Sequence, residues 1–234
     1  MHSGALIIFL VISLGAALAA TAHGGEGAND AEFKPATGDI VVCLGDSITD
    51  GNTYPQIIMQ ALREAGKPVP AVICSGVVCD TAPLMAARLR KTVLSFMPSL
   101  VTMAAGTNDA LRGETVEVYE KAVRAIAAAV RAAGARMILL TPCIIDVADA
   151  ARREAAEKMV AEYAKAIRRV AGDYGFAVAE NNALQNQARE EGRKVMSDDG
   201  IHPNYFGQSL IAVSYTHLRA HETPEHLVCR LLLE

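Results

Sequence analysis

The chain contains no tryptophan, and aromatic residues make up only 5% of its 234 residues. Sugar-binding modules depend on aromatic stacking platforms, so this scarcity argues against an appended module of that kind. Positive charge is not in excess either, because 22 Lys and Arg stand against 26 Asp and Glu, giving a formal net charge of -4. Nucleic-acid-binding proteins carry a basic footprint, and we therefore expect no nucleic-acid partner.

The first 22 residues are predicted to lie outside the folded domain. Residues 5–20 are almost entirely apolar, and small residues crowd their end, as they do at the cleavage site of a secretory signal peptide. We expect cleavage after Ala19 or Ala22, export to the periplasm or the cell exterior, and no stable membrane partner afterwards. The alternative is a membrane anchor, since the stretch nearly reaches spanning length. Residues 23–37 then form a short flexible lead.

The last 21 residues, 214–234, are predicted to be foreign to the domain. Residues 214–223 and 227–234 can both be encoded by nucleotide strings that resemble a transposase-type sequencing adapter. We hypothesise that the reading frame ran into library DNA near Val213, which would truncate the last helix of the domain, and such a scar is excluded from fold reasoning. The alternative is a native amphipathic helix.

Histidine is scarce once these segments are set aside. His202 is the only imidazole in residues 38–213, so a histidine base in the domain must be His202. The other five lie at or before the cleavage sites or in the tail: His2, His23, His217, His221 and His226.

Cysteine gives a weaker signal. An even number of cysteines in an exported protein permits disulfides, whose connectivity the sequence does not reveal. Cys43 lies inside a strand-like run and is expected to be a small core residue. No cysteine spacing resembles a zinc site, so we expect no metal and no cofactor. The cysteines outside the tail are Cys43, Cys74, Cys79 and Cys143.

Short apolar runs alternate with helical patterns along the single predicted domain. The runs lack strict apolar–polar alternation, which is typical of parallel strands covered on both faces. This order predicts an α/β fold, a three-layer α/β/α sandwich around a five-stranded parallel sheet. The five predicted strands are residues 40–44, 71–74, 100–104, 137–140 and 176–178.

The predicted helices lie between these strands. Apolar residues recur at steps of three and four over 116–130, with Thr115 as the expected N-cap and Gly134 as the expected stop. The pattern repeats over 156–170, where Gly172 is expected to end the helix. Less regular helices are expected over 54–65 and 84–96.

Several side chains able to carry chemistry follow the predicted strand ends. In open α/β sheets, ligands bind outside the carboxyl ends of the strands. We therefore expect these residues to gather at one edge of the sheet, and they are Ser47, Cys79, Asn108 and Cys143.

Two distant segments supply the groups that serine-based acyl transfer requires. Ser47 lies on a glycine-containing turn, Gly45-Asp46-Ser47, directly after a buried strand. Some 150 residues later, Asp199 and His202 supply a carboxylate and an imidazole three residues apart. A hydroxyl is a poor nucleophile unless a base takes its proton, and His202 is that base. Asp199 can fix the tautomer of the ring, with Asp198 as a rival for this role.

The segments also match a known pattern. Gly45-Asp46-Ser47, Gly106-Thr107-Asn108-Asp109 and Asp199-Gly200-Ile201-His202-Pro203 resemble the first, third and fifth blocks of the SGNH hydrolases, also called GDSL lipases and esterases. The segment from Cys74 to Thr81 resembles the second block imperfectly. The resemblance spans roughly residues 38–213 and implies a flavodoxin-like fold. Gly-x-Ser-x-Gly is absent, which argues against the α/β-hydrolase elbow.

The resemblance implies three donors for the oxyanion: the backbone N–H of Ser47, a backbone N–H in the second block at Cys79, and the side-chain amide of Asn108. The family places Asn where Cys74 stands and Gly where Cys79 stands. If position 79 demands a positive φ, a non-glycine residue there is strained. Alternatively, Cys79 adopts an ordinary conformation and the loop differs.

The remaining polar residues of these blocks are expected to brace loops or cap a helix. Asp46, Thr49 and Asp109 are interpreted as loop-bracing residues, and Thr81 as the N-cap of the helix that follows it.

Three functions fit this set of groups. The leading hypothesis is an exported serine esterase that cleaves small acyl groups, with acetyl on a decorated polysaccharide as one example. Its partner is then a small ester or an acylated carbohydrate. The second is an O-acyltransferase that moves the acyl group onto an envelope sugar. The third is a non-catalytic binding protein that keeps the fold.

Overall fold

The computed structural model describes residues 38–217 of the chain. The predicted signal peptide and lead, and the tail beyond position 217, lie outside the described residues. Within that range no helix combines the length and apolar character needed to cross a bilayer.

A five-stranded parallel sheet forms the centre of the molecule, in the order β2-β1-β3-β4-β5. This is the flavodoxin-like order, in which the chain reverses its direction of winding between β1 and β3. Both the predicted fold class and the five predicted strands are confirmed, with ends that differ by one or two residues. The strands are β1 Ile40–Gly45, β2 Ala71–Gly76, β3 Leu100–Ala104, β4 Arg136–Leu140 and β5 Ala177–Ala179.

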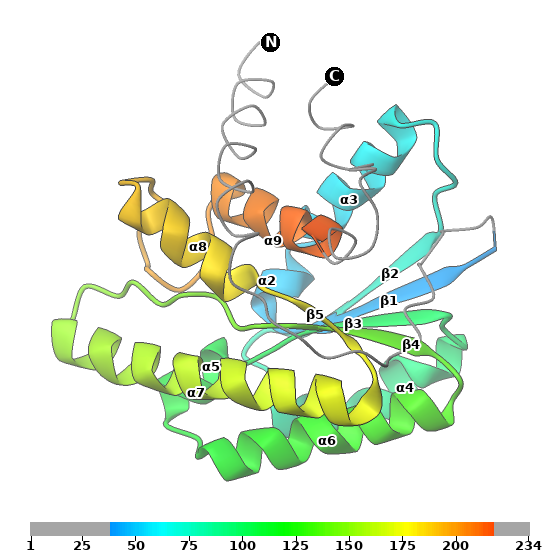
Figure 1. The fold of residues 1–234 in the computed structure, drawn as a ribbon, viewed down its shortest axis with the longest axis horizontal. Helices are drawn as coiled ribbons and strands as arrows, with labels where there is room; N and C mark the ends of the chain where they lie inside the picture. The colour runs from blue at the N-terminus through cyan, green and yellow to red at the C-terminus, as the bar shows by residue number, and fades with distance from the viewer. Residues whose placement is uncertain (1–37, 218–234) are drawn as a thin grey trace.

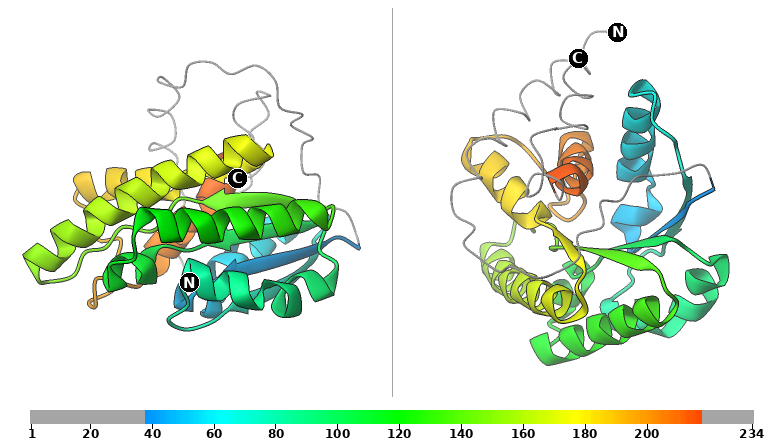
Figure 2. Two further views of the ribbon diagram at one scale, coloured as in Figure 1. Left: turned by 90° about the horizontal axis from the view of Figure 1, so that it is seen from below. Right: turned by 45° about the vertical axis from the view of Figure 1, so that its right-hand side comes forward.

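Helices cover both faces of the sheet, which gives the three layers visible in Figures 1 and 2. One face is covered by α4 (Ala82–Thr92), α6 (Val116–Ala132) and α7 (Ala150–Tyr174). The other is covered by α3 (Thr53–Glu64), α8 (Asn181–Glu190) and α9 (Tyr205–His217). In the space-filling view, α8 lies at the upper left and α7 across the lower part of the surface. The short elements are α2 (Ser47–Asp50), η2 (Leu94–Phe96) and α5 (Thr107–Arg112).

Burial on both faces explains the continuous apolar runs. In β1, Val42 and Leu44 belong to the large core under α4, α6 and α7, whereas Val41 and Cys43 pack on the opposite face. Cys43 is therefore a core residue, as predicted. Fully burying a side chain such as Val or Leu contributes about 1.5–3 kcal/mol, so alternating polar residues would destabilise the strand.

The strands end together, and this defines where the loops begin. Gly45 pairs with Gly76 on one side and with Ala104 on the other, and Ala104 pairs in turn with Leu140. The chain must turn tightly after this row, because α2 packs directly against it. A Cβ on Gly45 would lie 2.0 Å from Thr49 Oγ1, and one on Gly76 would lie 2.1 Å from Asp50 N. Glycine at both strand ends is what permits this close approach.

One helix end differs from the sequence-based expectation. Helix α6 begins after Thr115, whose Oγ1 accepts a hydrogen bond from Val118 N, and Gly134 follows its end, as predicted. Helix α7 continues through Gly172 and ends at Gly175, whose φ is 64°. The prediction at Gly172 was wrong because the left-handed conformation that ends the helix is adopted three residues later.

Helix α9 passes the predicted domain boundary at Val213. It continues to His217, and Ser214 within this extension is buried. The ring of Tyr215 stacks on that of Tyr54 in α3, with centroids 5.9 Å apart. The first residues of the segment predicted to be adapter-derived therefore extend the helix and pack on the sheet layer, and the origin of that segment stays a prediction.

The end of α7 generates a paired stability test. Gly172 lies within the helix and a Cβ there would meet no atom within 4 Å, so Gly172→Ala is expected to stabilise the protein by about 0.5–1 kcal/mol. Gly175→Ala is expected to destabilise it by about 1 kcal/mol, because φ is positive there. Urea unfolding measures both changes. A destabilising Gly172→Ala would contradict this helix end.

Candidate active site

Ser47 is held at the first position of α2 by a buried carboxylate. Asp46 is the N-cap of this helix, and its Oδ1 accepts a hydrogen bond of 2.9 Å from Ile48 N. The side chain of Asp46 is buried, whereas Ser47 is half-buried. The cap fixes the turn so that the Ser47 side chain leaves the sheet at the end of β1, next to the point where the winding reverses.

His202 reaches Ser47 from a loop near the end of the chain. The loop is closed by an antiparallel bridge between Met196 and Pro203 and by a 2.8 Å hydrogen bond from Ser197 N to His202 O. Its Gly200 O accepts from Asp146 N, which anchors the loop beyond β4. The Nε2 atom of His202 lies 2.9 Å from Ser47 Oγ. A base and a hydroxyl are thus within hydrogen-bond distance across 155 residues of sequence.

Asp199, and not Asp198, contacts the histidine ring. Its Oδ2 lies 2.6 Å from His202 Nδ1, and its Oδ1 accepts from the backbone N–H groups of Ile201 and His202. Desolvation raises the pKa of Asp199, but the His202 side chain and the two backbone donors outweigh it and lower the pKa to about 2. Asp198 instead forms an exposed ion pair with Lys194. The geometry therefore favours Asp199 as the partner of the ring.

The backbone N–H groups of Ser47 and Cys79 have no hydrogen-bond acceptor among the described residues. Cys79 has φ of 63°, so the structure adopts the strained alternative, in which a non-glycine residue occupies a left-handed conformation. Within residues 38–217, neither Ser47 N nor Cys79 N donates a hydrogen bond to another protein group. Free donors beside a hydroxyl are what an oxyanion-binding site needs.

The side-chain amide of Asn108 lies at this edge of the sheet, but it already donates hydrogen bonds to other protein groups. Its Nδ2 donates to Asp80 O at 2.9 Å and to Asp46 Oδ2 at 3.3 Å. An amide nitrogen has two hydrogens, so both are in use. To donate to a bound oxyanion, Asn108 would have to exchange one of these bonds, and the longer one to Asp46 is the weaker.

The cysteines are separate thiols. Cys43, Cys74, Cys79 and Cys143 are all free, so the disulfides that the sequence permitted are not formed among them. Cys74, where the resemblance led us to expect Asn, donates from Sγ to Thr49 O at 2.9 Å and so ties α2 to β2. Cys143 is not at the surface with the other predicted residues. It is buried beneath them, where Sγ accepts from Asn181 Nδ2.

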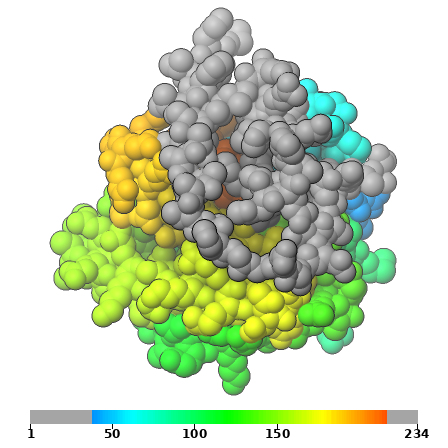
Figure 3. Space-filling model, in the orientation of Figure 1, coloured from blue at the N-terminus to red at the C-terminus, as the bar shows by residue number. Residues whose placement is uncertain are grey.

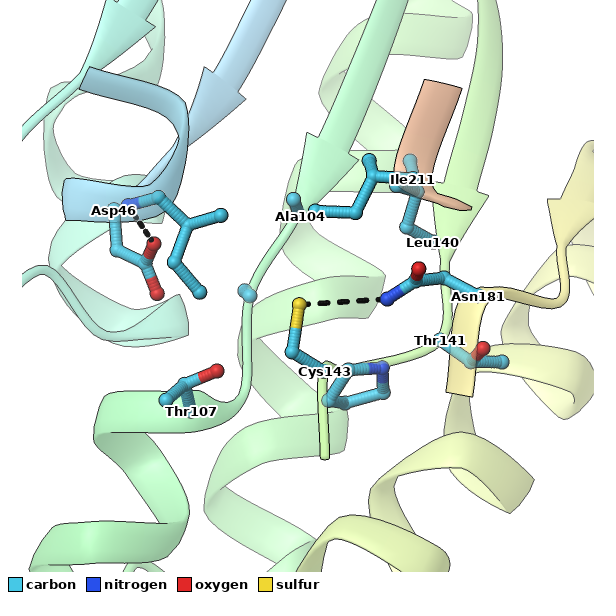
Figure 4. A pocket seen from close by; sticks show the side chains of 11 residues that line it. Asp46, Ala104, Thr107, Leu140, Thr141, Cys143, Asn181 and Ile211 are labelled. Atoms are coloured by element: carbon cyan, nitrogen blue, oxygen red, sulfur yellow. Dashed lines mark hydrogen bonds between the residues drawn. The ribbon is translucent and has the colours of Figure 1, made fainter. Parts of the chain in front are cut away.

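A small cavity separates Cys143 from the serine turn (Figure 4). Its volume is about 10 Å³, and Asp46, Thr107 and Asn181 contribute polar groups to its lining. The side chains of Asp46 and Asn181 approach it from opposite sides. A space of this size cannot accommodate an acyl chain, so any substrate must contact Ser47 from the open side.

The polar residues expected to brace loops do so. Thr49 Oγ1 lies 3.1 Å from Tyr54 OH, and Asp109 Oδ1 accepts from Ala82 N at the start of α4. Thr81 stands at the N-cap of α4, as predicted, although its side chain makes no capping hydrogen bond. The described part of the chain contains no cluster of three or more His, Cys, Asp or Glu side chains able to hold a metal ion.

One residue that contacts several loops of the site was not predicted from the sequence. Arg88 in α4 forms a partly buried ion pair of 2.6 Å with Asp80, which follows Cys79. The only sequence signal is that Arg88 immediately precedes the buried Leu89 on the helix, three residues after the buried Met85. A lone arginine beside an apolar stripe is normally solvent-exposed, so the pattern does not single it out.

Two buried carboxyl groups lie under the site. Burial raises the pKa of Asp46 from 3.8 to about 6, and the nearby charge of Asp109 adds to the shift. Burial likewise raises the pKa of Asp109 from 3.8 to about 6. The Oδ2 atom of Asp109 has no hydrogen-bond partner, which is consistent with a site that favours the protonated form.

These carboxyl groups predict a pH-dependent stability. A raised carboxyl pKa stabilises the fold fully below the unfolded value of 3.8, and this contribution disappears as pH rises through about 6. Asparagine cannot titrate. We therefore expect the unfolding free energy of the wild type, relative to Asp109→Asn, to fall by about 3 kcal/mol from about pH 3.5 to about pH 7. Urea unfolding over this range measures the difference, and a constant difference would refute the assignment.

Solved structures similar to this one are hydrolases. A catalytic mutant of an acetylxylan esterase from Geobacillus stearothermophilus matches with a TM-score of 0.72 at 18% identity, covering 80% of this chain and 96% of that one. An alpha/beta hydrolase enzyme from the metagenome of Lake Arreo, Spain, matches with a TM-score of 0.71 at 24% identity, covering 81% and 98%. The lipase/acylhydrolase from Enterococcus faecalis matches with a TM-score of 0.68 at 23% identity, covering 80% and 98%.

These likenesses confirm the fold, and the family follows from the sequence itself. A search of curated proteins finds no significant match. The model of the GDSL-like lipase/acylhydrolase family matches residues 43–210, a span that includes Ser47, Asn108 and His202. The chain therefore belongs to the GDSL-like lipase/acylhydrolase family of carboxylic ester hydrolases.

Proposed function

We propose that this esterase hydrolyses small acyl esters, acetyl esters among them, with Ser47 as nucleophile, His202 as general base and Asp199 as the residue that orients the ring. One observation carries the proposal. Ser47 Oγ lies 2.9 Å from His202 Nε2, while the other ring nitrogen lies 2.6 Å from Asp199 Oδ2. This is the order of contacts that activates a serine hydroxyl.

The reaction proceeds in two halves. In the first, His202 takes the proton of Ser47 as Oγ attacks the acyl carbon, and then gives it to the departing alcohol. Ser47 is left as an acyl ester. In the second, His202 takes a proton from water, the resulting attack releases the acid, and Ser47 recovers its proton. Proton transfer by a positioned base typically contributes about 10²–10⁴-fold to such steps.

Asp199 stabilises the imidazolium that forms in both halves. Because its pKa is lowered to about 2, Asp199 is ionised at neutral pH. Its Oδ1 is held by two backbone N–H groups, so Oδ2 points at the ring without needing a further partner. The carboxylate then fixes the tautomer in which Nε2 is free to accept the Ser47 proton.

The developing negative charge on the carbonyl oxygen would be met by three donors. The unoccupied N–H groups of Ser47 and Cys79 are two of them, and the Nδ2 of Asn108 is the third. When Asn108 turns to the oxyanion it gives up its 3.3 Å bond to Asp46 and keeps the 2.9 Å bond to Asp80 O. The exchange is favourable because a charged acceptor at short range replaces a long contact.

The site supports water as the acyl acceptor and a small acyl group. The side chains of His202 and Asp199 are 44% and 46% exposed, so water reaches the base directly. The structural similarity to an acetylxylan esterase supports acetylated polysaccharide as one substrate class. The predicted export signal would place the enzyme where such polymers occur.

The nucleophile is tested by substitution and labelling. Ser47→Ala is expected to lower kcat on acetyl esters by at least about 10³-fold, because no other hydroxyl within residues 38–217 hydrogen-bonds to His202. A fluorophosphonate probe should label the wild type on Ser47, as read by peptide mass spectrometry. Ser95→Ala, which removes an exposed hydroxyl in η2, is the control and should leave kcat and labelling unchanged. Undiminished turnover by Ser47→Ala would reject the proposal.

The amide of Asn108 is tested separately. Asn108→Ala removes one oxyanion donor and is expected to lower kcat by about 10²–10³-fold with a smaller change in KM. Asn108→Asp should be worse, since it places a second carboxylate beside Asp46 and the oxyanion. Asn186→Ala, which removes an amide from the surface of α8, is the control. Near-normal kcat in Asn108→Ala would show that the amide does not bind the oxyanion.

A further inference from the structure

Arg88 links three segments of the chain that meet behind the site. Its Nε donates to Asp80 Oδ2 at 2.6 Å, and one terminal nitrogen donates to Ser75 Oγ at 2.8 Å and to Thr92 Oγ1 at 3.0 Å. The other donates to Gly45 O at 3.0 Å and to Ser75 O at 2.9 Å. The side chain is only 16% exposed. A guanidinium with all of its groups bound in this way has a fixed position.

Apart from Thr92, which lies on the same helix as Arg88, each acceptor belongs to a segment that carries a proposed catalytic group. Gly45 is two residues before Ser47, at the end of β1. Ser75 is next to the end of β2, where the loop to Cys79 starts. Asp80 directly follows Cys79. Arg88 therefore fixes the distance between the serine turn and the loop that presents the second N–H donor.

The loop needs such a brace because its conformation is unfavourable. Cys79 has φ of 63°, and a non-glycine residue persists in this conformation only when surrounding contacts determine it. Arg88 holds the carboxylate of Asp80, while Asn108 Nδ2 binds the carbonyl of the same residue at 2.9 Å. Arg112 also donates to Cys79 O, but from an exposed position. Through Asp80, Arg88 thus sets both the direction of Cys79 N and the position of the Asn108 amide.

We propose that Arg88 is a positioning residue that pre-organises the oxyanion site by locking the Asp80 carboxylate, and with it the 77–80 loop, to the ends of β1 and β2. The inference rests on the proposed function, since it assigns Arg88 a role in stabilising the same oxyanion. Arg88 itself does not touch the substrate. Its loss raises the barrier to acyl transfer because donors displaced by a fraction of an ångström no longer meet the oxygen.

A purely structural role makes a different prediction. A buried ion pair that only supports the fold would, when broken, lower stability and the fraction of active molecules, while each folded molecule kept its turnover rate. A positioning role lowers kcat for each active site and leaves KM nearly unchanged, because the donors act mainly on the transition state. The two roles separate when kcat is normalised to the number of sites that react with a fluorophosphonate.

The experiment compares Arg88→Lys with the wild type. Lysine keeps the charge beside Asp80 but cannot reproduce the fork that reaches Gly45 and Ser75. We expect kcat per titrated site to fall by about 10–100-fold, with KM within about threefold. Hydrogen–deuterium exchange should also accelerate in the 77–80 amides, a readout that does not depend on activity. Arg88→Met combined with Asp80→Asn, which leaves no charge unpaired, should give a fall in kcat at least as large.

Arg124→Lys is the matched control. Arg124 also makes a multidentate ion pair, with Glu120 and Asp173, but it joins α6 to α7 away from the site. It should leave kcat per site unchanged. Unchanged kcat per site in the Arg88 variants, with or without faster exchange, overturns the positioning role. Retained turnover in Ser47→Ala would instead overturn the proposed function and this inference with it, so the two failures are distinguishable.

Discussion

The shared end point of the parallel strands is the constraint on which the site depends. Gly76, Gly45, Ala104 and Leu140 form one row across the sheet, and the segments that carry Ser47, Cys79 and Asn108 start from it. Because these parallel strands end in one row, the chain returns to the same edge of the sheet at the end of each strand. Ser47 and Asn108 consequently emerge on neighbouring strands, β1 and β3, where the direction of winding reverses. The glycines in this row allow α2 to lie against the sheet, so the serine turn is short.

Charge is distributed unevenly around this edge, and each carboxyl group has its own environment. Asp199 is half-exposed, accepts three hydrogen bonds and has its pKa lowered to about 2. Asp46 and Asp109 are buried and have their pKa raised to about 6. Asp80 is also buried, but Arg88 compensates its charge directly. One carboxylate is thus kept ionised next to the base, while those beneath the serine turn serve as caps and braces.

The segment 74–81 departs from the family pattern at position 79, yet its backbone keeps the conformation that the pattern implies. The resemblance led us to expect glycine at position 79, and the backbone adopts the left-handed conformation that glycine would favour, although the residue is cysteine. Cys79 N donates no hydrogen bond to another group within the described residues, so this N–H is free for a ligand despite the substitution. The unfavourable backbone is supported by contacts from Arg88, Arg112 and Asn108 to the same loop. A strained backbone conformation thus persists only where contacts from surrounding residues hold it in place.

The sequence by itself determined the layers, the strands and the residues able to act as nucleophile and base. Apolar runs and helical periodicity depend on local burial, and the absence of other histidines from residues 38–213 left His202 as the only candidate in that range. It could not determine where α7 ends, because Gly172 and Gly175 both permit a stop and helix packing selects between them. Nor could it show that Asp199 faces the ring, that Cys79 adopts a positive φ, or that Arg88 pairs with Asp80. Those outcomes depend on contacts between segments distant in the chain, and only the tertiary structure brings these segments together.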